Sequence, residues 1–207
     1  MPENLHKLFV ISSPSGGGKT SLINKLFEDS RSANFEKSIS DTSRQKRQGD
    51  LEGKDYYFLS EKDFKDKIKK EEYVEYATVF GNFYGTSKEE IKTKYNNSNL
   101  ILELDWQGAY AVKELFDDAK LIFLVPPSLD DLKQRLIKRN LDSSQEIENR
   151  LSEAKKEISK SEMYDYLVLN DDFHKAFEDL SQILFEGISP IDFNSRASKD
   201  LIKRLVE

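Results

Sequence analysis

The chain has 207 residues, no cysteine, and a formal net charge of −6 with 34% charged residues. The absence of cysteine excludes disulfides, thiolate metal sites and cysteine nucleophiles, and it fits a protein of the reducing cytoplasm. The acidic balance argues against a nucleic-acid-binding protein. The first apolar run is too short to be a signal-peptide core or a membrane span, so we expect neither nucleic acid nor a membrane as a partner.

A short apolar run, Leu8–Ile11, is followed by the glycine-rich stretch Ser12–Ser21 and then by Leu22–Phe27, where apolar residues recur at helical spacing. This order predicts a phosphate-binding loop, because glycines let several backbone N–H groups turn toward an anion at a helix N-terminus. Lys19 can reach the β- and γ-phosphates of a nucleotide, and the Thr20 hydroxyl can hold Mg²⁺. The alternative is a plain Gly/Ser turn, which Gly-Lys-Thr directly after a buried strand disfavours.

Three cations, Arg44, Lys46 and Arg47, fall within one short segment between hydroxyl residues and glycines. Arginine offers a planar fork that matches phosphate oxygens, so the segment suits a loop that grips a phosphate. A solvated basic loop is an equally good interpretation when the segment is taken alone.

A helix is predicted over Glu61–Lys70 and a strand over Tyr73–Phe80. Glu75 lies among the apolar residues of that strand. It is either the outward member of an alternating strand or a carboxylate that accepts two N–H groups from the edge of a ligand. Further on, Ser87 resembles the N-cap of a helix.

The next predicted buried strand is Asn99–Asp105, which ends in carboxylates. Ligands of open α/β sheets lie beyond the carboxyl ends of the strands, where acidic residues can hold Mg²⁺ directly or through water. Glu103 could instead be an outward strand position, and Asp105 the N-cap of a helix that contains Ala109–Leu115. Trp106 is expected to be a core residue.

Two charged helices are predicted, one capped by Ser128 and running through Asp130–Leu136, and one over Gln145–Met163. Arg135 and Arg139 are four residues apart and share one helix face, and the second helix carries Arg150. Two charged helices joined by a polar loop are typical of a lid that closes over phosphates. An exposed helical hairpin is the better interpretation of this segment taken alone.

Further apolar strands are predicted at Lys120–Val125 and Tyr166–Leu169, and a helix over Phe173–Glu186. Alternating apolar strands and helices after a phosphate-binding loop predict an α/β fold with a doubly wound parallel sheet. The segment from about residue 38 to residue 96 breaks the alternation and is predicted to be an insertion. Residues 188–207 are predicted to form a linker and a terminal helix that could support a homo-oligomer.

Five features occur in the order that one family shows: the glycine-rich loop, the basic segment, Glu75, the stretch Leu102–Gly108 and Asn170–Asp172. On these features the chain resembles the guanylate kinases, from about Leu5 to Glu186. That family has a P-loop NTPase-type core with an inserted nucleoside-monophosphate-binding region and a helical lid. Its enzymes transfer the γ-phosphoryl group of ATP to GMP or dGMP with Mg²⁺, a reaction of purine nucleotide metabolism and GMP recycling.

The resemblance implies one domain over residues 5–187, with a core formed by 5–37, 97–127 and 164–187, a GMP-binding insertion at 38–96 and a lid at 128–163. For ATP it implies a site formed by Ser13, Pro14, Ser15, Gly16, Gly17, Gly18, Lys19, Thr20, Ser21 and Asn170. For GMP it implies Ser40, Arg44, Arg47, Tyr56, Glu75, Tyr84, Thr86 and Asp105. The catalytic set that it implies is Lys19, Arg44, Asp105, Arg135, Arg139 and Arg150. Thr20 would bind Mg²⁺ directly, and Glu103 would do so through water.

The chain departs from the family pattern at several positions. Ser13 stands where the strict phosphate-loop motif begins with glycine, which is within the family's variation. Thr42-Ser43-Arg44 and Lys46-Arg47 stand where the family often has Thr-Thr-Arg and Pro-Arg. The family also often has Asp where this chain has Glu103, and the extra methylene leaves the role of Glu103 open.

Glu75 predicts selection of guanine. Guanine presents two donors, N1–H and the exocyclic amine, which one carboxylate can accept, whereas N1 of adenine is an acceptor that a carboxylate repels. Two rival hypotheses are a catalytically inactive guanylate-kinase-like module that binds proteins, and a kinase for another acceptor such as AMP. The intact Gly18-Lys19-Thr20 sequence and the lid arginines favour a catalyst over the binding module.

Overall fold

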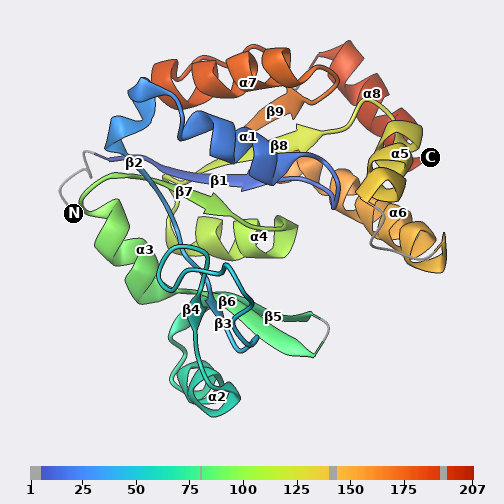
Figure 1. The fold of residues 1–207 in the computed structure, drawn as a ribbon. Coiled ribbons are helices and arrows are strands. Elements are labelled where there is room, and N and C mark those ends of the chain that lie inside the picture. Colours follow the sequence, from blue (N-terminus) through green and yellow to red (C-terminus); the bar gives the residue numbers. More distant parts are fainter. Residues whose placement is uncertain (1–5, 80, 140–143, 192–194) are drawn as a thin grey trace.

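The computed structural model describes residues 6–79, 81–139, 144–191 and 195–207. Within these ranges the main sheet has five parallel strands in the order β2-β7-β1-β8-β9 (Figure 1). The strands are β1 (Leu8–Ser12), β2 (Phe35–Lys37), β7 (Asn99–Glu103), β8 (Lys120–Val125) and β9 (Tyr166–Leu169). All five residues of β1 are buried, as expected for a parallel strand that is covered on both faces.

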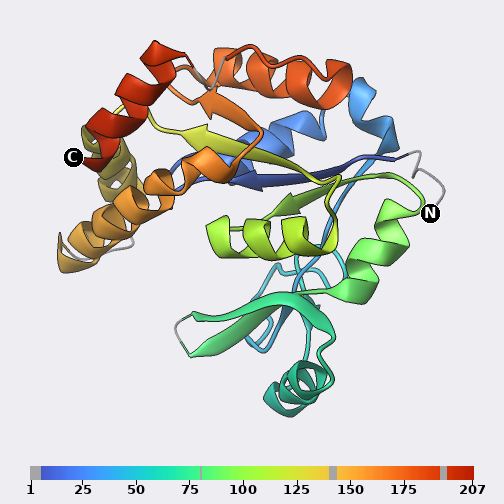
Figure 2. The same cartoon turned by 180° about the vertical axis from the view of Figure 1, so that it is seen from behind.

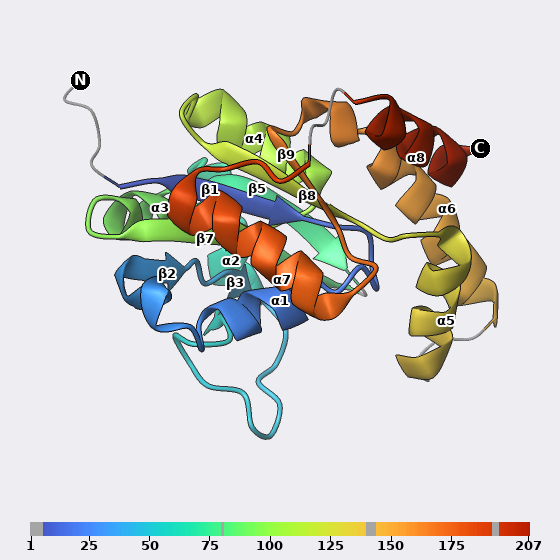
Figure 3. The same ribbon diagram turned by 90° about the horizontal axis from the view of Figure 1, so that it is seen from above.

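Helices cover both faces of this sheet. Alternate residues of β1 point to opposite sides, so Phe9 and Ile11 pack with α1 (Lys19–Leu26) and α7 (Phe173–Ser181), whereas Leu8 and Val10 face the other side. That side is covered by α3 (Lys88–Tyr95) and α4 (Trp106–Leu115). Figures 2 and 3 show the two helical layers from behind and from above. The predicted doubly wound α/β fold is confirmed.

A second, mixed sheet lies beside the first, in the order β4-β3-β6-β5 among the described residues. Its elements are β3 (Asp41–Thr42), β4 (Tyr57–Phe58), α2 (Glu61–Lys69), β5 (Tyr73–Val79) and β6 (Asn82–Ser87). The buried ring of Phe64 stacks on Tyr73 at 4.5 Å and on Phe83 at 5.3 Å between centroids. This region therefore has a small aromatic core of its own.

Three helices gather at one end of the molecule, α5 (Leu129–Arg139), α6 (Ser144–Ser159) and α8 (Arg196–Val206) (Figure 3). The Ser128 hydroxyl accepts a hydrogen bond from the Asp131 N–H at 3.0 Å, which confirms the predicted cap of α5. Helix α8 packs on α6, and Leu205 of α8 is buried in the core. Among the described residues, none of the helices has the length and apolar character that crossing a membrane requires.

One burial assignment and two helix ends differ from the sequence prediction. Trp106 is half-buried at the start of α4, with the Lys160 ammonium 5.5 Å from its ring centre, so its assignment to the core was wrong. The predicted helix over Phe173–Glu186 is an α-helix only to Ser181 and continues as a π-helical turn, Gln182–Glu186. The helix predicted to reach Met163 ends at Ser159, before a separate 3-10 turn, Ser161–Met163.

The 3-10 turn Ser30–Asn34 and strand β2 were not predicted at all. Strand β2 has only three residues, Phe35, Glu36 and Lys37, two of them charged. Such a segment has too few apolar positions to show the periodicity of a strand. This edge strand of the main sheet could therefore not be predicted from the sequence pattern.

The aromatic core of the second sheet gives a stability prediction. Phe64→Ala removes a fully buried ring and should lower the free energy of unfolding by about 3–5 kcal/mol, measured by urea denaturation. Phe173→Ala is the control, since this ring is 39% exposed and its loss should cost about 1 kcal/mol or less. Equal losses in the two variants would contradict the burial of Phe64.

Candidate active site

The glycine-rich loop joins β1 to α1 through a tight turn in which the Gly17 N–H donates to the Pro14 carbonyl at 2.8 Å. Gly16 and Gly18 have φ angles of 88° and 90°, which residues with a side chain rarely adopt. A Cβ at Gly18 would also lie 2.4 Å from the Asn170 amide nitrogen. Gly18 is the N-cap of α1, so the free N–H groups and the positive end of that helix face the loop. The turn can therefore cradle an anion.

Asn170, just after β9, holds this loop from the side. Its side-chain amide donates to the Gly17 carbonyl at 2.7 Å, and its main-chain carbonyl accepts from Arg135 of α5 at 2.8 Å. A hollow of about 350 Å³ opens here, lined by Gly16, Gly18, Ser21, Arg135, Lys138, Asn170, Asp171 and Phe173. The structure thus brings the loop, Arg135 and Asn170 together around one concave surface.

Lys19 extends from the first turn of α1 and donates to the Leu104 carbonyl at 3.1 Å. The side chain keeps some accessible surface, but protein atoms closely surround its ammonium group. This burial lowers the pKa of Lys19, and the negative charges of Glu103, Glu157 and Asp105 oppose the shift. Three carboxylates therefore help to keep this partly desolvated lysine positively charged.

Thr20 and Glu103 meet where the loop passes β7. The Thr20 hydroxyl donates to Glu103 Oε1 at 2.5 Å, and Glu103 Oε2 pairs with the Lys37 ammonium of β2 at 2.6 Å. Burial alone would raise the pKa of Glu103, but the Lys37 charge and the hydrogen bonds from Lys37 and Thr20 outweigh it and lower the pKa. Hydroxyl and carboxylate oxygens are ligands that suit Mg²⁺, which also uses substrate phosphates and water. The residues therefore fit the expected ion.

Glu75 of β5 lies opposite Thr86 of β6, whose hydroxyl donates to Glu75 Oε1 at 2.7 Å. The Glu75 side chain is half-buried, and a Cβ on Gly108 of α4 would come within 3.1 Å of its Cγ. Burial raises the pKa of Glu75, and the hydrogen bond from Thr86 partly offsets the rise. Glu75 is therefore not a freely solvated strand residue, since it lies between the second sheet and the start of α4.

Asp105 is the N-cap of α4, one of the alternatives that the sequence left open. Its Oδ1 accepts from the N–H groups of Gln107 and Gly108, each at 2.9 Å. The electrostatic coupling between Asp105 and Glu75 helps to raise the pKa of Glu75. The capping role thus fixes Asp105 at the junction of the loop and the second sheet.

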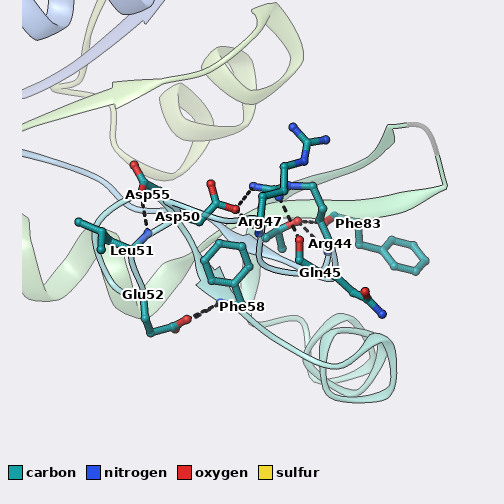
Figure 4. A network of polar contacts seen from close by, with 10 residues as sticks. Arg44, Gln45, Arg47, Asp50, Leu51, Glu52, Asp55, Phe58 and Phe83 are labelled. Atoms are coloured by element: carbon teal, nitrogen blue, oxygen red, sulfur yellow. Dashed lines mark hydrogen bonds and ion pairs between the residues drawn. The ribbon is translucent and has the colours of Figure 1, made fainter.

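The basic segment folds against the second sheet, as Figure 4 shows. Arg44 pairs with Asp50 at 2.9 Å, and Asp50 also accepts from the Arg47 N–H at 2.7 Å. The Arg44 guanidinium carbon lies 5.5 Å from the ring centre of Tyr56, which in turn lies 5.7 Å from that of Tyr84. The structure therefore brings together Arg44, Tyr56 and Tyr84. Predicted residue Ser40 lies close by, where its carbonyl accepts from the Tyr57 N–H.

Helix α6 places two charged side chains near the loop. Arg150 donates to the Ser15 hydroxyl at 2.9 Å, so α6 contacts the loop. Glu157, two turns further on, was not predicted as a site residue. Its burial raises its pKa to about 7, with Lys19 opposing and Asp105 adding to the rise. The side chain of Arg139, at the end of α5, lies outside the described residues.

A parallel sheet, a glycine-rich loop at a helix N-terminus and a lysine-threonine pair together define a P-loop NTPase-type nucleotide-binding protein. The family model described as Guanylate kinase matches residues 5–187. The chain therefore belongs to the guanylate kinase family, whose members are nucleoside monophosphate kinases.

Relatives support this membership. The chain is 46% identical over 184 residues to a guanylate kinase of Wolbachia sp. subsp. Brugia malayi, which covers 88% of this chain and 93% of the relative. It is 47% identical over 178 residues to one of Hahella chejuensis, which covers 86% of this chain and 85% of the relative. A crystal structure of guanylate kinase from Anaplasma phagocytophilum superposes with a TM-score of 0.68 at 31% identity, and covers 99% of this chain and 98% of that one.

The raised pKa of Glu157 predicts how stability depends on pH. When the pKa of a carboxyl group is higher in the folded than in the unfolded chain, the free energy of unfolding falls as the pH rises. The fall runs from the unfolded pKa, near 4.5, through the folded pKa, about 7. Glu157→Gln should therefore melt a few degrees higher than the wild type at pH 8, with the difference shrinking toward pH 5, since one pKa unit is about 1.4 kcal/mol. Melting curves across this pH range test it, and Glu148→Gln, exposed on the same helix, is the control. A pH-independent difference would contradict the assignment.

Proposed function

We propose that this chain transfers the γ-phosphoryl group of ATP to GMP and dGMP in a Mg²⁺-dependent reaction, giving ADP and GDP or dGDP. The observation that carries the proposal is Glu75, a half-buried carboxylate held by Thr86 at the start of α4, beyond the same sheet edge as the phosphate loop. The division into core, insertion at 38–96 and lid at 128–163 belongs to the same proposal.

The donor side is the glycine-rich loop with its neighbours. The turn around Gly16–Gly18 and the N-terminus of α1 suit the β- and γ-phosphates, with Lys19 beside them. The hollow next to Asn170 suits the adenosine part of ATP. Arg135 and Arg150 lie close enough to close on the phosphates, and we assign Arg139 the same role from the family resemblance alone.

The acceptor side is the second sheet. The two oxygens of the Glu75 carboxylate could accept hydrogen bonds from N1–H and the 2-amino group of guanine. Ser40 and Thr86 would lie beside the base. The phosphate of GMP would be held by Arg44, Arg47, Tyr56 and Tyr84. Arg44 is paired with Asp50 at 2.9 Å, so the incoming phosphate would replace that carboxylate as its anionic partner.

The reaction is a direct in-line transfer without a covalent enzyme intermediate. The GMP phosphate is already a competent nucleophile, so this chain's task is to position two anions and to stabilise the charge that spreads over the transferring group. Lys19 and the lid arginines supply positive charge, and bound Mg²⁺ neutralises phosphate oxygens. Closure of α5 and α6 excludes water, which would otherwise accept the phosphoryl group.

We place this reaction in the cytoplasm, within purine nucleotide metabolism and GMP recycling, a location with which the absence of cysteine agrees. Self-association through α8 belongs to the same proposal. The loop geometry around Gly18, Lys19 and Thr20 is intact, which favours catalysis over a protein-binding module of the same fold.

A side-by-side acceptor assay tests the proposal. Coupled ADP release should be fast with GMP and dGMP and at least about a hundredfold slower with AMP, CMP and UMP, because only guanine offers two donors to Glu75. Lys19→Ala should reduce turnover with GMP by at least about a hundredfold while GMP still binds, since its ammonium stabilises transferring charge. Absence of turnover with every acceptor would support the binding module, and preference for AMP would overturn guanine selection.

Glu75→Gln tests the base-reading carboxylate separately. The amide can accept only one guanine donor and turns its own NH₂ toward the other, so the affinity for GMP should fall by roughly tenfold to a hundredfold. The affinity for ATP should change by less than about twofold. Isothermal titration measures both, and Glu89→Gln, exposed on α3, is the control. Unchanged affinity for GMP would remove Glu75 from the site.

A further inference from the structure

Lys37 is a charged residue of the main sheet that takes no part in the proposed reaction. It lies on β2, at the edge of the described sheet, and β2 pairs with β7. Its ammonium pairs with Glu103 Oε2 at 2.6 Å, while Glu103 Oε1 accepts from the Thr20 hydroxyl at 2.5 Å. Strands β2 and β7 and helix α1 thus contribute one residue each to a continuous polar row.

The direction of the Thr20 bond matters for cation binding. A threonine hydroxyl has one proton and two lone pairs. Because the proton is given to Glu103, both lone pairs point away from that carboxylate and are free to bind a cation. If Glu103 turned away, the Thr20 hydroxyl could rotate and point its proton, instead of a lone pair, toward the cation. The position of Glu103 therefore decides whether Thr20 faces the nucleotide as a ligand.

Glu103 has a second cation within electrostatic reach. The negative charge of Glu103 opposes the lowering of the pKa of Lys19 that burial causes. A glutamate has one more rotatable bond than the aspartate common in this family, and could swing toward Lys19 and draw it away from phosphates. In the structure Lys37 pairs with Glu103 Oε2, whereas Lys19 donates to the Leu104 carbonyl at 3.1 Å.

The backbone at Lys37 is itself anchored. Its carbonyl accepts from the Lys94 ammonium of α3 at 2.8 Å, and Lys94 pairs with Glu90 at 2.7 Å. Both side chains of this pair are largely buried, at 16% and 9% exposure. Glu90 in turn accepts from the Ile39 N–H at 2.8 Å. The stem from which Lys37 extends is therefore fixed between the sheet and the segment that leads to the second sheet.

We propose that Lys37 is a positioning residue for the metal site: by pairing with one oxygen of Glu103 it holds the other against the Thr20 hydroxyl, which orients Thr20 to bind the Mg²⁺ of a bound nucleotide. This inference rests on the proposed function for the nucleotide that brings the ion. It concerns only Mg²⁺-dependent nucleotide binding, so it is tested without an acceptor and without turnover.

The test measures ADP affinity by isothermal titration, once with Mg²⁺ and once with EDTA, for the wild-type chain and Lys37→Met. Methionine keeps the length of the side chain and removes its charge. We expect Mg²⁺ to tighten ADP binding in the wild type, and this gain to shrink about tenfold in Lys37→Met, with affinity in EDTA changed by less than about twofold. Lys25→Met is the matched control, because Lys25 of α1 forms an exposed ion pair at 2.9 Å with Glu28, just beyond the end of that helix.

A double-mutant cycle with Glu103→Gln separates positioning from a merely structural effect. If Lys37 acts through Glu103, Lys37→Met should add nothing to the loss of the Mg²⁺ gain that Glu103→Gln causes alone, and Lys37→Arg should keep most of the gain. Should Lys37→Met not fold, Lys37→Gln takes its place, since a neutral amide also removes the ion pair with Glu103.

Three outcomes would overturn the proposal: an undiminished Mg²⁺ gain in Lys37→Met, additive losses in the double variant, or tighter MgADP binding in Lys37→Met. The last would mean that the lysine competes with the metal. Failure of the proposed function looks different, because it would appear in the acceptor assay and leave the Mg²⁺ dependence of ADP binding intact.

Discussion

The parallel register between β1 and β7 is the constraint on which the site depends. Ile11, the penultimate residue of β1, pairs with Glu103, the last residue of β7. Both strands therefore end at the same height, and the chain leaving β1 turns into the phosphate loop beside the chain leaving β7. Hydrogen bonds from Lys19 to Leu104 and from Thr20 to Glu103 follow directly from that alignment. A shift of one residue would turn Glu103 to the opposite face and break both contacts.

The start of α4 is the second organising feature. Within a few residues, Leu104 binds the loop lysine, Asp105 caps the helix, and Gly108 leaves room for Glu75. A side chain at Gly108 would press against the Glu75 stem at 3.1 Å. The phosphate loop and the second sheet therefore both contact the start of one helix, which brings segments far apart in the sequence to one place.

Much of this could be predicted from the sequence, and the failures have physical causes. The phosphate loop, the buried strands and the caps at Ser87 and Ser128 show in local patterns of glycine, apolar runs and hydroxyls. Lys37 and Glu157 could not be found in this way. Their roles come from neighbours that are 66 residues away along the chain for Lys37 and on a separate helix for Glu157. A lysine in a polar strand or a glutamate in a charged helix looks like ordinary surface until the fold supplies its partner. The prediction for Trp106 was wrong for the opposite reason. An aromatic residue suggests a core position even where, as here, the start of a helix leaves the side chain only half-buried.

Strand β2 also limits how chains can associate. An edge strand exposes unpaired backbone groups on which a strand from another molecule can grow, and proteins avoid this with short edges and charges. Here the edge has three residues, with Glu36 exposed and Lys37 directed inward to a carboxylate. A neighbouring molecule would find a template of only three residues, with the partly exposed ion pair of Lys37 and Glu103 beneath it. The Lys37–Glu103 ion pair thus also makes the addition of a foreign strand along this side of the sheet unfavourable.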